Sequence, residues 1–287
     1  MKRRELYNLF LLVLIAVLFT EVWITKLVSD SKLQRLDEKT VQTQEYRDME
    51  IGEEMLAYIL GKEELGVDVG LYLLESRFGY QKFPYAYSKG SFLELQKKWK
   101  NQRNWRLYRD YNRAIWDDLQ YFPVAEFTDD KTLTVSFGNS WRAERNYGGK
   151  RFHEGTDIMA SKNVAGIYPI VSMTDGIVRS KGWLEKGGYR IGIEAPSGAY
   201  FYYAHLHSYA SLEIGDEVQA GELLGFMGDS GYGVEGTTGK FPVHLHLGVY
   251  IYPEKQEMSI NPYWLLRYLE NCRVKCSSKN LSYGDIR

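Results

Sequence analysis

Histidine and cysteine are both scarce in this chain of 287 residues. It has two cysteines, Cys272 and Cys276, and five histidines, none of which precedes residue 153. Two cysteines are too few for the disulfide framework of a small secreted domain, and with no histidine beside them in sequence they make a weak metal site. The simpler interpretation is a local staple or two free thiols.

A surplus of charge is also missing, because 36 lysines and arginines face 37 aspartates and glutamates, for a formal net charge of -1. Phosphate binding needs a basic surplus somewhere on the fold, so nucleic acid is not expected as the main partner. The densest basic stretch, residues 97–113, is interleaved with acidic residues. We expect a solvated helix face there rather than a contact with an anionic polymer.

The N-terminus carries basic residues at positions 2–4, followed by an apolar stretch over residues 6–24. A helix that crosses a bilayer needs about 20 residues, which is close to this length. A signal-peptide core is the alternative because the uninterrupted part, residues 9–19, is short, but no small-residue cleavage pattern follows it. We therefore predict a cytoplasmic tail over residues 1–5 and an uncleaved transmembrane signal anchor over residues 6–26, with everything after it outside the membrane.

The stretch behind this anchor changes character twice. Residues 27–43 are polar and mixed in charge, which suits a stalk. Over residues 44–128 the apolar residues recur at helical spacing, so that Met55, Ile59 and Leu60 share one face, and glycine and proline divide the region into several short helices. We predict a small helical domain or pro-segment there, packed on the C-terminal half of the chain.

From about residue 130, short alternating runs separated by glycine and aspartate are typical of an antiparallel β domain. We expect this domain over residues 130–271, with a closing helix at Tyr263–Leu269 after Pro262 and a C-terminal tail over residues 272–287. The predicted fold class is therefore multidomain α and β: a transmembrane helix, a small helical domain and a mainly antiparallel-β domain. The expected strands contain Ile177–Val178, Tyr189–Ile193, Tyr200–Leu206, Leu223–Met227 and Val243–Ile251.

The five histidines fall in three clusters within this predicted β domain. Zinc takes imidazole and carboxylate ligands, and a catalytic zinc keeps three protein ligands and one open position for water. The clusters are therefore typical of a zinc hydrolase site. They are His153-Glu-Gly-Thr-Asp157, His205-Leu-His207 and His244-Leu-His246.

His244 and His246 alternate with apolar residues, so in a strand both imidazoles project from one face, about 7 Å apart. They can be two metal ligands, or one ligand and one acid–base group. The spacing of His153 and Asp157 brings both to one side of a helical turn or of a tight loop, and Gly155 favours the loop. The aspartate would supply an anionic oxygen ligand.

The middle cluster also places two histidines, His205 and His207, on one strand face. Spacing alone leaves open which of the two His-x-His pairs binds the metal. The glycine-rich segment over residues 228–239 lacks the Lys-Ser/Thr of a phosphate-binding loop. We interpret it as a wall beside a peptide groove or as a plain loop.

Taken in order, the motifs of the second half resemble those of the LytM/lysostaphin-type zinc metallopeptidases, which cut peptide bonds in bacterial peptidoglycan. The resemblance covers residues 137–269, nearly half of the chain. The motifs that carry it are Phe137-Gly138, His153-Glu-Gly-Thr-Asp157-Ile158, Thr174-Asp-Gly-Ile-Val178, Tyr203-Ala-His-Leu206, Gly215-Asp-Glu-Val218, Gly221-Glu-Leu-Leu-Gly225 and His244-Leu-His246.

The resemblance implies a role for five of these residues. It assigns His153, Asp157 and His246 as ligands of Zn²⁺, and it places His205 and His244 beside the open coordination position as catalytic histidines. Proton transfer and stabilisation of the oxyanion are not divided between the two catalytic histidines.

Three features depart from the family pattern. His207 has no counterpart there, so we interpret it as a rim or structural residue. Phe241-Pro-Val243 and Leu247-Gly248 stand where relatives commonly carry Gly-Pro and Phe. These departures affect strand packing and the groove wall, and so bear on specificity rather than on activity.

The resemblance implies a zinc metalloendopeptidase that hydrolyses peptide bonds of peptidoglycan in remodelling the cell wall, and the N-terminal segment adds the prediction that it is membrane-anchored. It would be a single-pass protein of the cell membrane with its catalytic domain extracellular. Its partners would be peptidoglycan peptides and, through the N-terminal helix, the membrane. The alternative is a catalytically silent LytM-like module that binds peptidoglycan or regulates, and the complete set of metal and acid–base positions argues against it.

A third interpretation places a second activity in the helical region. Leu74-Glu75-Ser76 faintly resembles the Glu-Ser of lytic transglycosylases, with Glu75 as the general acid. The match is short and lacks the downstream motif of that family. A glutamate exposed to solvent at a helix end is the simpler interpretation.

Overall fold

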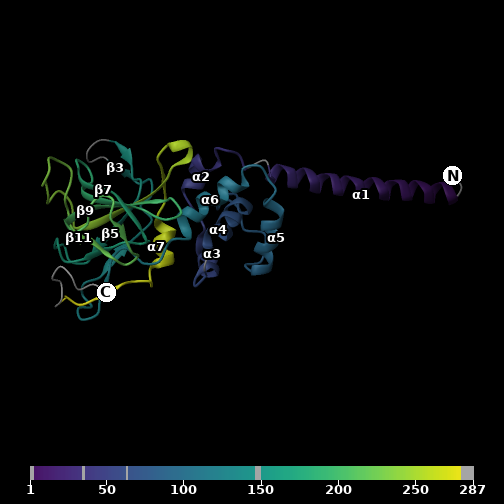
Figure 1. Cartoon of the computed structure of the whole chain (residues 1–287). Coiled ribbons are helices and arrows are strands. Elements are labelled where there is room, and N and C mark those ends of the chain that lie inside the picture. The colour runs from purple at the N-terminus through teal and green to yellow at the C-terminus, as the bar shows by residue number, and fades with distance from the viewer. Residues whose placement is uncertain (1–2, 34–35, 63, 146–149, 279–287) are drawn as a thin grey trace.

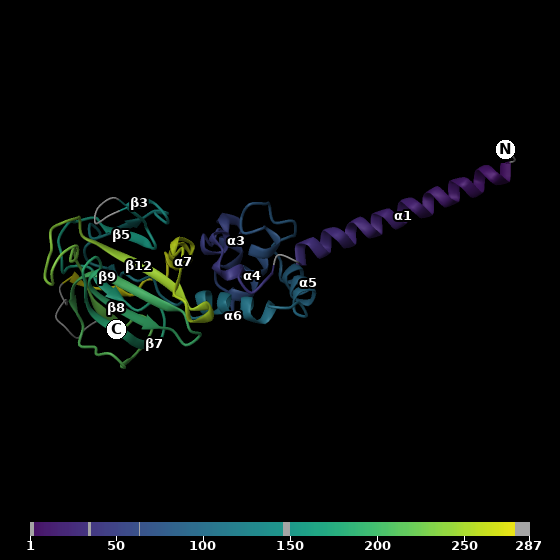
Figure 2. The ribbon, with the colours of Figure 1, turned by 90° about the horizontal axis from the view of Figure 1, so that it is seen from above.

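The computed structural model of the chain arranges three parts in a row. Figure 1 shows a long N-terminal helix, α1 (Arg3–Leu33), then a group of short helices, and a β domain at the far end. The same order is visible from above in Figure 2. The structure describes residues 3–33, 36–62, 64–145 and 150–278, so parts of the two predicted tails, residues 1–2 and 279–287, lie outside the described residues.

Helix α1 exposes apolar side chains such as Phe10, Leu12 and Phe19 and continues to Leu33, into the predicted stalk. Over the residues that the structure describes, no helix is both long enough and apolar enough to pass through a membrane. The transmembrane anchor predicted for residues 6–26 is therefore wrong. Its uninterrupted apolar part is residues 9–19, which is about 16 Å of helix against a hydrocarbon layer of about 30 Å.

The region after α1 is helical, as predicted. Helix α4 is buried along nearly its whole length, and it packs on α6, where the Tyr108 hydroxyl donates a hydrogen bond of 3.0 Å to the Gly70 carbonyl. Leu60 does not join Met55 and Ile59 in the core, because α3 ends at Ile59 and Leu60 is 52% exposed. The elements are η1 (Thr40–Gln42), α2 (Gln44–Arg47), α3 (Gly52–Ile59), α4 (Leu65–Glu75), α5 (Lys89–Trp99) and α6 (Trp105–Trp116).

Glu75 lies at the C-terminal end of α4, but it is buried and not exposed as the sequence suggested. Its Oε1 accepts hydrogen bonds from the Lys98 Nζ at 2.7 Å and the Trp99 Nε1 at 2.8 Å. A buried charge is tolerated when it is paired and hydrogen-bonded in this way. Glu75 therefore ties α4 to α5.

The β domain is built on a ten-stranded sheet in which every strand pairing is antiparallel, which confirms the predicted class of this domain. The main path runs β10-β7-β8-β9-β12-β5-β2, while β11 joins β6 to β9 and β13 extends β12. The strands are β2 (Val135–Phe137), β5 (Thr156–Ala160), β6 (Pro169–Val171), β7 (Gly176–Leu184), β8 (Gly188–Glu194), β9 (Tyr200–Tyr209), β10 (Glu217–Val218), β11 (Leu223–Met227), β12 (His244–Ile251) and β13 (Met258–Ile260).

Two smaller strand pairs flank this sheet. The hairpin of β3 (Glu144–Arg145) and β4 (Arg151–Phe152) leads into the first histidine cluster. Near the C-terminus β14 (Lys275–Cys276) runs parallel to β1 (Glu126–Phe127). Both cysteines are free thiols: Cys272 is exposed, while burial raises the pKa of the Cys276 thiol to about 11.

Side chains alternate across the central strands, as the period of a strand requires. On one face Ile158 of β5, Phe201 of β9, and Leu245 and Leu247 of β12 are completely buried. The opposite face carries His246 of the third histidine cluster together with Tyr200, Tyr202 and Tyr250. The alternation therefore separates the core of the β domain from a face that is free to form a site.

Helix α7 (Tyr263–Leu269), which coincides with the predicted closing helix, lies between the β domain and the helical region (Figure 1). Its Tyr268 ring meets Trp116 of α6 edge to face, with ring centroids 6.3 Å apart. Arg47 of α2 makes a second connection, because its Nε donates to the Ser259 carbonyl at 2.9 Å. The helical region and the β domain are thus in direct contact.

Candidate functional site

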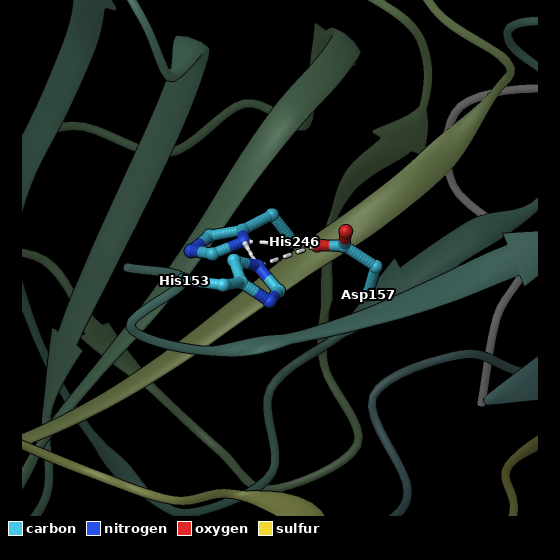
Figure 3. Close-up of side chains that lie close together, drawn as sticks. All are labelled: His153, Asp157 and His246. Carbon is cyan, nitrogen blue, oxygen red and sulfur yellow. Dashed lines mark hydrogen bonds and ion pairs between the residues drawn. The ribbon is translucent and has the colours of Figure 1, made fainter. Parts of the chain in front are cut away.

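Three side chains from two separate parts of the sequence converge on the open face of the sheet (Figure 3). His153 follows β4, Asp157 lies in β5 and His246 lies in β12, where the strand register places it opposite Asp157. The His153 Nε2 is 2.9 Å from the His246 Nδ1 and 3.0 Å from the Asp157 Oδ1, and the last two atoms are 3.0 Å apart. Among the described residues this is the group of His, Asp, Glu and Cys side chains that could hold a metal ion.

Gly155 makes this convergence possible, since it lies in the loop between His153 and Asp157 and packs directly on β12. A Cβ at this position would lie 2.5 Å from the Leu247 carbonyl oxygen and 2.6 Å from the His246 Cε1. Neither distance is sterically allowed, so a larger residue would push the loop away from the strand. The glycine therefore sets the approach of two candidate ligands to the third.

The hydrogen bond on the far side of the His153 ring determines which nitrogen faces this group. Its Nδ1 lies 3.0 Å from the Ser140 carbonyl oxygen. A carbonyl can only accept, so in a neutral imidazole Nδ1 carries the proton and Nε2 presents a lone pair. Nε2 lies 3.0 Å from an oxygen of Asp157, so a cation between the two atoms would be bound by both.

The spacing of the three atoms fits a small tetrahedral metal ion. Nitrogen and oxygen ligands about 2.0–2.1 Å from one zinc ion lie about 3.3 Å from each other, and the observed separations are 2.9 to 3.0 Å. Two imidazoles and one carboxylate are also a ligand set that a catalytic zinc takes. A ring nitrogen that donates to a backbone carbonyl is the usual support behind such a ligand.

Asp157 is held as an anion. Burial on its own raises the pKa of this carboxyl, but the contacts with His153 and His246 outweigh burial and leave the pKa well below its usual range. Its second oxygen, Oδ2, accepts a hydrogen bond from Arg145 of β3. Arg145 thereby orients the carboxylate so that Oδ1 faces the two histidines.

His205 and His244 lie beside this group with their rings 4.7 Å apart, centroid to centroid. Their Nδ1 atoms lie 2.8 Å and 2.7 Å from the carbonyl oxygens of Ser230 and Pro242. By the same argument as for His153, both rings carry the proton on Nδ1 and keep a free lone pair on Nε2. The His244 Nε2 is 3.8 Å from the Asp157 Oδ1.

Both histidines are neutral at neutral pH. Burial, followed by the nearby His244 and His246, holds the pKa of His205 well below its usual value. Burial also lowers the pKa of His244, against the opposing charge of Asp157. A neutral imidazole with a free Nε2 is able to accept a proton, which is the requirement for a general base.

The middle cluster differs from the simple alternation expected of a strand. His205 has a left-handed backbone with φ of 63°; the register with β8 shifts across it, and the register with β11 shifts just after it. Such a conformation is uncommon for a residue other than glycine and costs free energy. As a result His205 is buried beside His244, whereas His207, two residues later, is exposed.

A groove of about 910 Å³ surrounds the two groups of histidines. Tyr232 of the glycine-rich segment lines it, as do Tyr200 and Tyr202. Sequence reasoning missed Arg145, Arg151 and Arg190, which also line it. Arg190 and Tyr202 lie on neighbouring antiparallel strands, which only the register reveals, and no local motif marks Arg145.

The helical region touches the loop of the candidate ligands without lining the groove. Arg47 of α2 donates from Nη2 to the Glu154 carboxylate at 3.0 Å, and Glu154 directly follows His153. Of the described residues that line the groove, all lie between residues 145 and 257.

Comparisons with known proteins agree with this geometry. The description "LytM, N-terminal domain" matches residues 31–118, and "Peptidase family M23" matches residues 151–262. The crystal structure of a lytM protein from Ruminococcus gnavus ATCC 29149, provisionally named a glycyl-glycine endopeptidase, is 55% identical and superposes with a TM-score of 0.82, over 86% of this chain and 98% of that chain. The chain belongs to peptidase family M23.

A curated relative of this M23 peptidase is the L-Ala–D-Glu endopeptidase of Bacillus subtilis (strain 168). The two are 42% identical over 150 residues, which are 52% of this chain and 43% of the relative. The M23 peptidase thus spans less than half the length of that protein. Membership of the family makes it a peptide hydrolase by class.

Proposed function

We propose that this chain is a zinc-dependent endopeptidase that hydrolyses peptide bonds in bacterial peptidoglycan. The observation that carries the proposal is the convergence of the His153 Nε2, the Asp157 Oδ1 and the His246 Nδ1 beside two histidines that each keep a free Nε2. Family M23 supplies the class of reaction. The presence of all three candidate metal ligands and both candidate catalytic histidines is also the reason to prefer an enzyme over a silent peptidoglycan-binding module.

In this proposal His153, Asp157 and His246 hold the metal. Zinc, when bound to such a set, lowers the pKa of a water ligand to about 7 and polarises the scissile carbonyl. The ionised Asp157 offsets part of the positive charge of the ion. The carbonyl of Ser140 keeps the His153 ring in the tautomer that binds metal.

His205 and His244 handle the proton. Each has a neutral ring, and a neutral ring accepts the proton of the attacking water on Nε2 and later returns it to the leaving amine. Each protonated ring can also donate to the developing oxyanion. The backbone carbonyls of Ser230 and Pro242 hold the rings in place during both steps.

Two bonds are candidates for the substrate, because the relatives carry different names. One is the bond between L-Ala and D-Glu, by likeness to the Bacillus subtilis relative. The other is a glycyl-glycine bond, by likeness to the Ruminococcus gnavus protein. Since peptidoglycan lies outside the cytoplasmic membrane, we propose that the peptidase domain acts there.

The test is digestion of purified cell walls by the full chain, together with its metal content. We expect about one zinc per chain and new peptide termini in the released fragments. The His246→Ala variant should lose the metal and the activity, the His205→Ala variant should lose turnover and keep the metal, and the His207→Ala variant should keep both. A chain that holds zinc but releases no new peptide termini from any type of wall would contradict the proposed activity and favour the silent module.

A further inference from the structure

The groove is richer in cationic than in acidic side chains, although the whole chain has a formal net charge of -1. Five lysines and arginines line it against three carboxylates. A groove with this balance attracts an anionic substrate. The cationic residues are Arg145, Arg151, Lys186, Arg190 and Lys240, and the acidic residues are Glu154, Asp157 and Glu257.

Two of the three arginines already bond to protein groups. Arg145 pairs with Asp157, and Arg151 donates to the Tyr232 hydroxyl. All three arginines have one buried nitrogen without a hydrogen-bond partner, which in Arg190 is Nη1. Arg190 differs from the other two because, among the described residues, no carboxylate forms an ion pair with it and no side chain accepts a hydrogen bond from its guanidinium. A guanidinium has five N–H donors, and a buried one left unpaired costs free energy.

The strand register locates Arg190 relative to the candidate metal ligands. His246 of β12 lies opposite Ala204 of β9. The next strand, β8, pairs with β9 through Tyr189 and Ile191, and its register shift between these two residues places Arg190 beside Ala204. Two strand spacings separate β12 from β8, so the backbones of His246 and Arg190 are about 10 Å apart.

That separation suits contact with the substrate residue next to the scissile bond. An extended peptide advances about 3.3 Å per residue, and the arginine side chain covers much of the remaining distance. The side chain of the neighbouring substrate residue therefore comes within reach of the guanidinium. The side chain of a substrate residue several positions away does not come within reach of the guanidinium.

Tyrosines form the immediate surroundings of Arg190. Burial raises the pKa of Tyr202, and the positive charge of Arg190 opposes that rise; Tyr200 is affected in the same direction. The Tyr202 hydroxyl lies over Gly187, where a Cβ would come within 2.2 Å of it. The absence of a side chain at Gly187 lets this ring lie against the groove wall beside the guanidinium.

We propose that Arg190 binds a carboxylate on the substrate residue adjacent to the scissile bond. The ligand chemistry is a peptide with a free acidic group, and a chain of glycines has none there. This inference rests on the proposed function and separates its two candidate bonds, in favour of the one that involves D-Glu. A guanidinium and a carboxylate form two parallel charge-assisted hydrogen bonds, which satisfy donors that the protein leaves open.

The test compares kcat/KM for two peptides cleaved by the zinc-loaded full chain. Both contain the L-Ala–D-Glu bond; one keeps the free carboxylate of D-Glu and the other carries an amide in its place. We expect the acidic peptide to be preferred about 10- to 100-fold, the range of a hydrogen bond to a charged group. A glycine pentapeptide serves as a third substrate and should be cleaved no better than the amide.

Variants of one groove position give the decisive readout. Arg190→Gln should reduce the preference to near one, while Arg190→Lys should keep part of it, because lysine retains the charge without the planar fork. Lys186→Gln is the matched control, since it removes one groove charge at an exposed position and should keep the preference. The preference should also persist at high salt, because a short, partly buried contact is screened little.

The possible failures are distinguishable. If the wild-type chain cleaves none of the three peptides and no cell wall, the proposed function fails. If it cleaves the acidic and amide peptides equally well, or prefers the glycine peptide, the role of Arg190 is overturned and the proposed function stands. A preference that survives in Arg190→Gln, with zinc content unchanged, also overturns it.

Discussion

Two carboxylates that are largely withdrawn from solvent, Glu75 in the helical region and Asp157 in the β domain, have opposite surroundings. Glu75 accepts hydrogen bonds from Lys98 and Trp99, so its charge is compensated within the protein. Asp157 Oδ1 instead lies 3.0 Å from a ring nitrogen of His153 and 3.0 Å from one of His246. A buried carboxylate bonded to a lysine and an indole holds the fold together, whereas one bonded to two imidazoles, which can themselves bind a metal, is prepared for a cation.

The largest effect is expected when the charge of Asp157 is removed. Asp157→Asn keeps the shape of the side chain, but its neutral amide is a poor substitute for an anionic ligand. We expect the chain to lose most of its metal and its turnover to fall by about 10³-fold or more, because metal catalysis supplies several kcal/mol. Metal analysis and a peptide-cleavage assay on the same preparation would measure both.

If the Asp157→Asn variant bound metal and remained fully active, the contrast with Glu75 would be contradicted. Asp157 would then be no different from a structural carboxylate. The His246→Asn variant is a useful companion. It removes a neutral ligand and should give the same double loss.

The next effect concerns a residue that does not bind the metal in the proposed site. His205→Ala should retain the metal and lose about 10²- to 10⁴-fold in turnover, the range of general acid–base catalysis. His207→Ala is the matched control, being two residues away on the same strand and exposed. Equal losses in the two variants would argue for a general disturbance of β9 and against a specific role for the His205 ring.

The smallest effect is expected at Glu75. Glu75→Gln removes the charge that Lys98 pairs with and weakens the link between α4 and α5, so the free energy of unfolding should fall by about 1–3 kcal/mol. Metal content and peptide cleavage should match those of the wild-type chain. Thermal unfolding and a glycan-cleavage assay would check this, and the appearance of a Glu75-dependent glycan cleavage would revive the general-acid interpretation.

Much of the fold is predictable from local pattern. The alternation in β7, β8, β9, β11 and β12 and the Asn-Pro that precedes α7 each indicate an element that the structure contains. The transmembrane prediction failed for a physical reason. The apolar stretch over residues 6–24 counts flanking residues beyond its uninterrupted part, residues 9–19, and that part alone is too short to cross a membrane. The prediction that Leu60 shares a helix face with Met55 and Ile59 failed for another reason, because spacing does not say where a helix ends.

The site is predictable as an inventory but not as an arrangement. The spacing of His153 to Asp157 and of His244 to His246 indicates metal chemistry, and their assignment as ligands and catalytic groups remains a prediction. Spacing could not indicate that His205 itself has a left-handed backbone. That backbone turns the His205 side chain in a different direction from the side chain of His207. It could not identify Arg145 or Arg190 either, because strand register and the far side of a hairpin bring them to the groove.

The three histidines that donate from Nδ1 do so to main-chain carbonyls, at Ser140, Ser230 and Pro242. A change of side chain at any of these positions leaves the acceptor in place. The protonation pattern of the site is therefore insulated from point mutation at its supporting residues, and sequence drift can alter the walls of the groove without disturbing the tautomers. A peptidase built in this way is free to acquire new substrates while its proton chemistry is inherited unchanged.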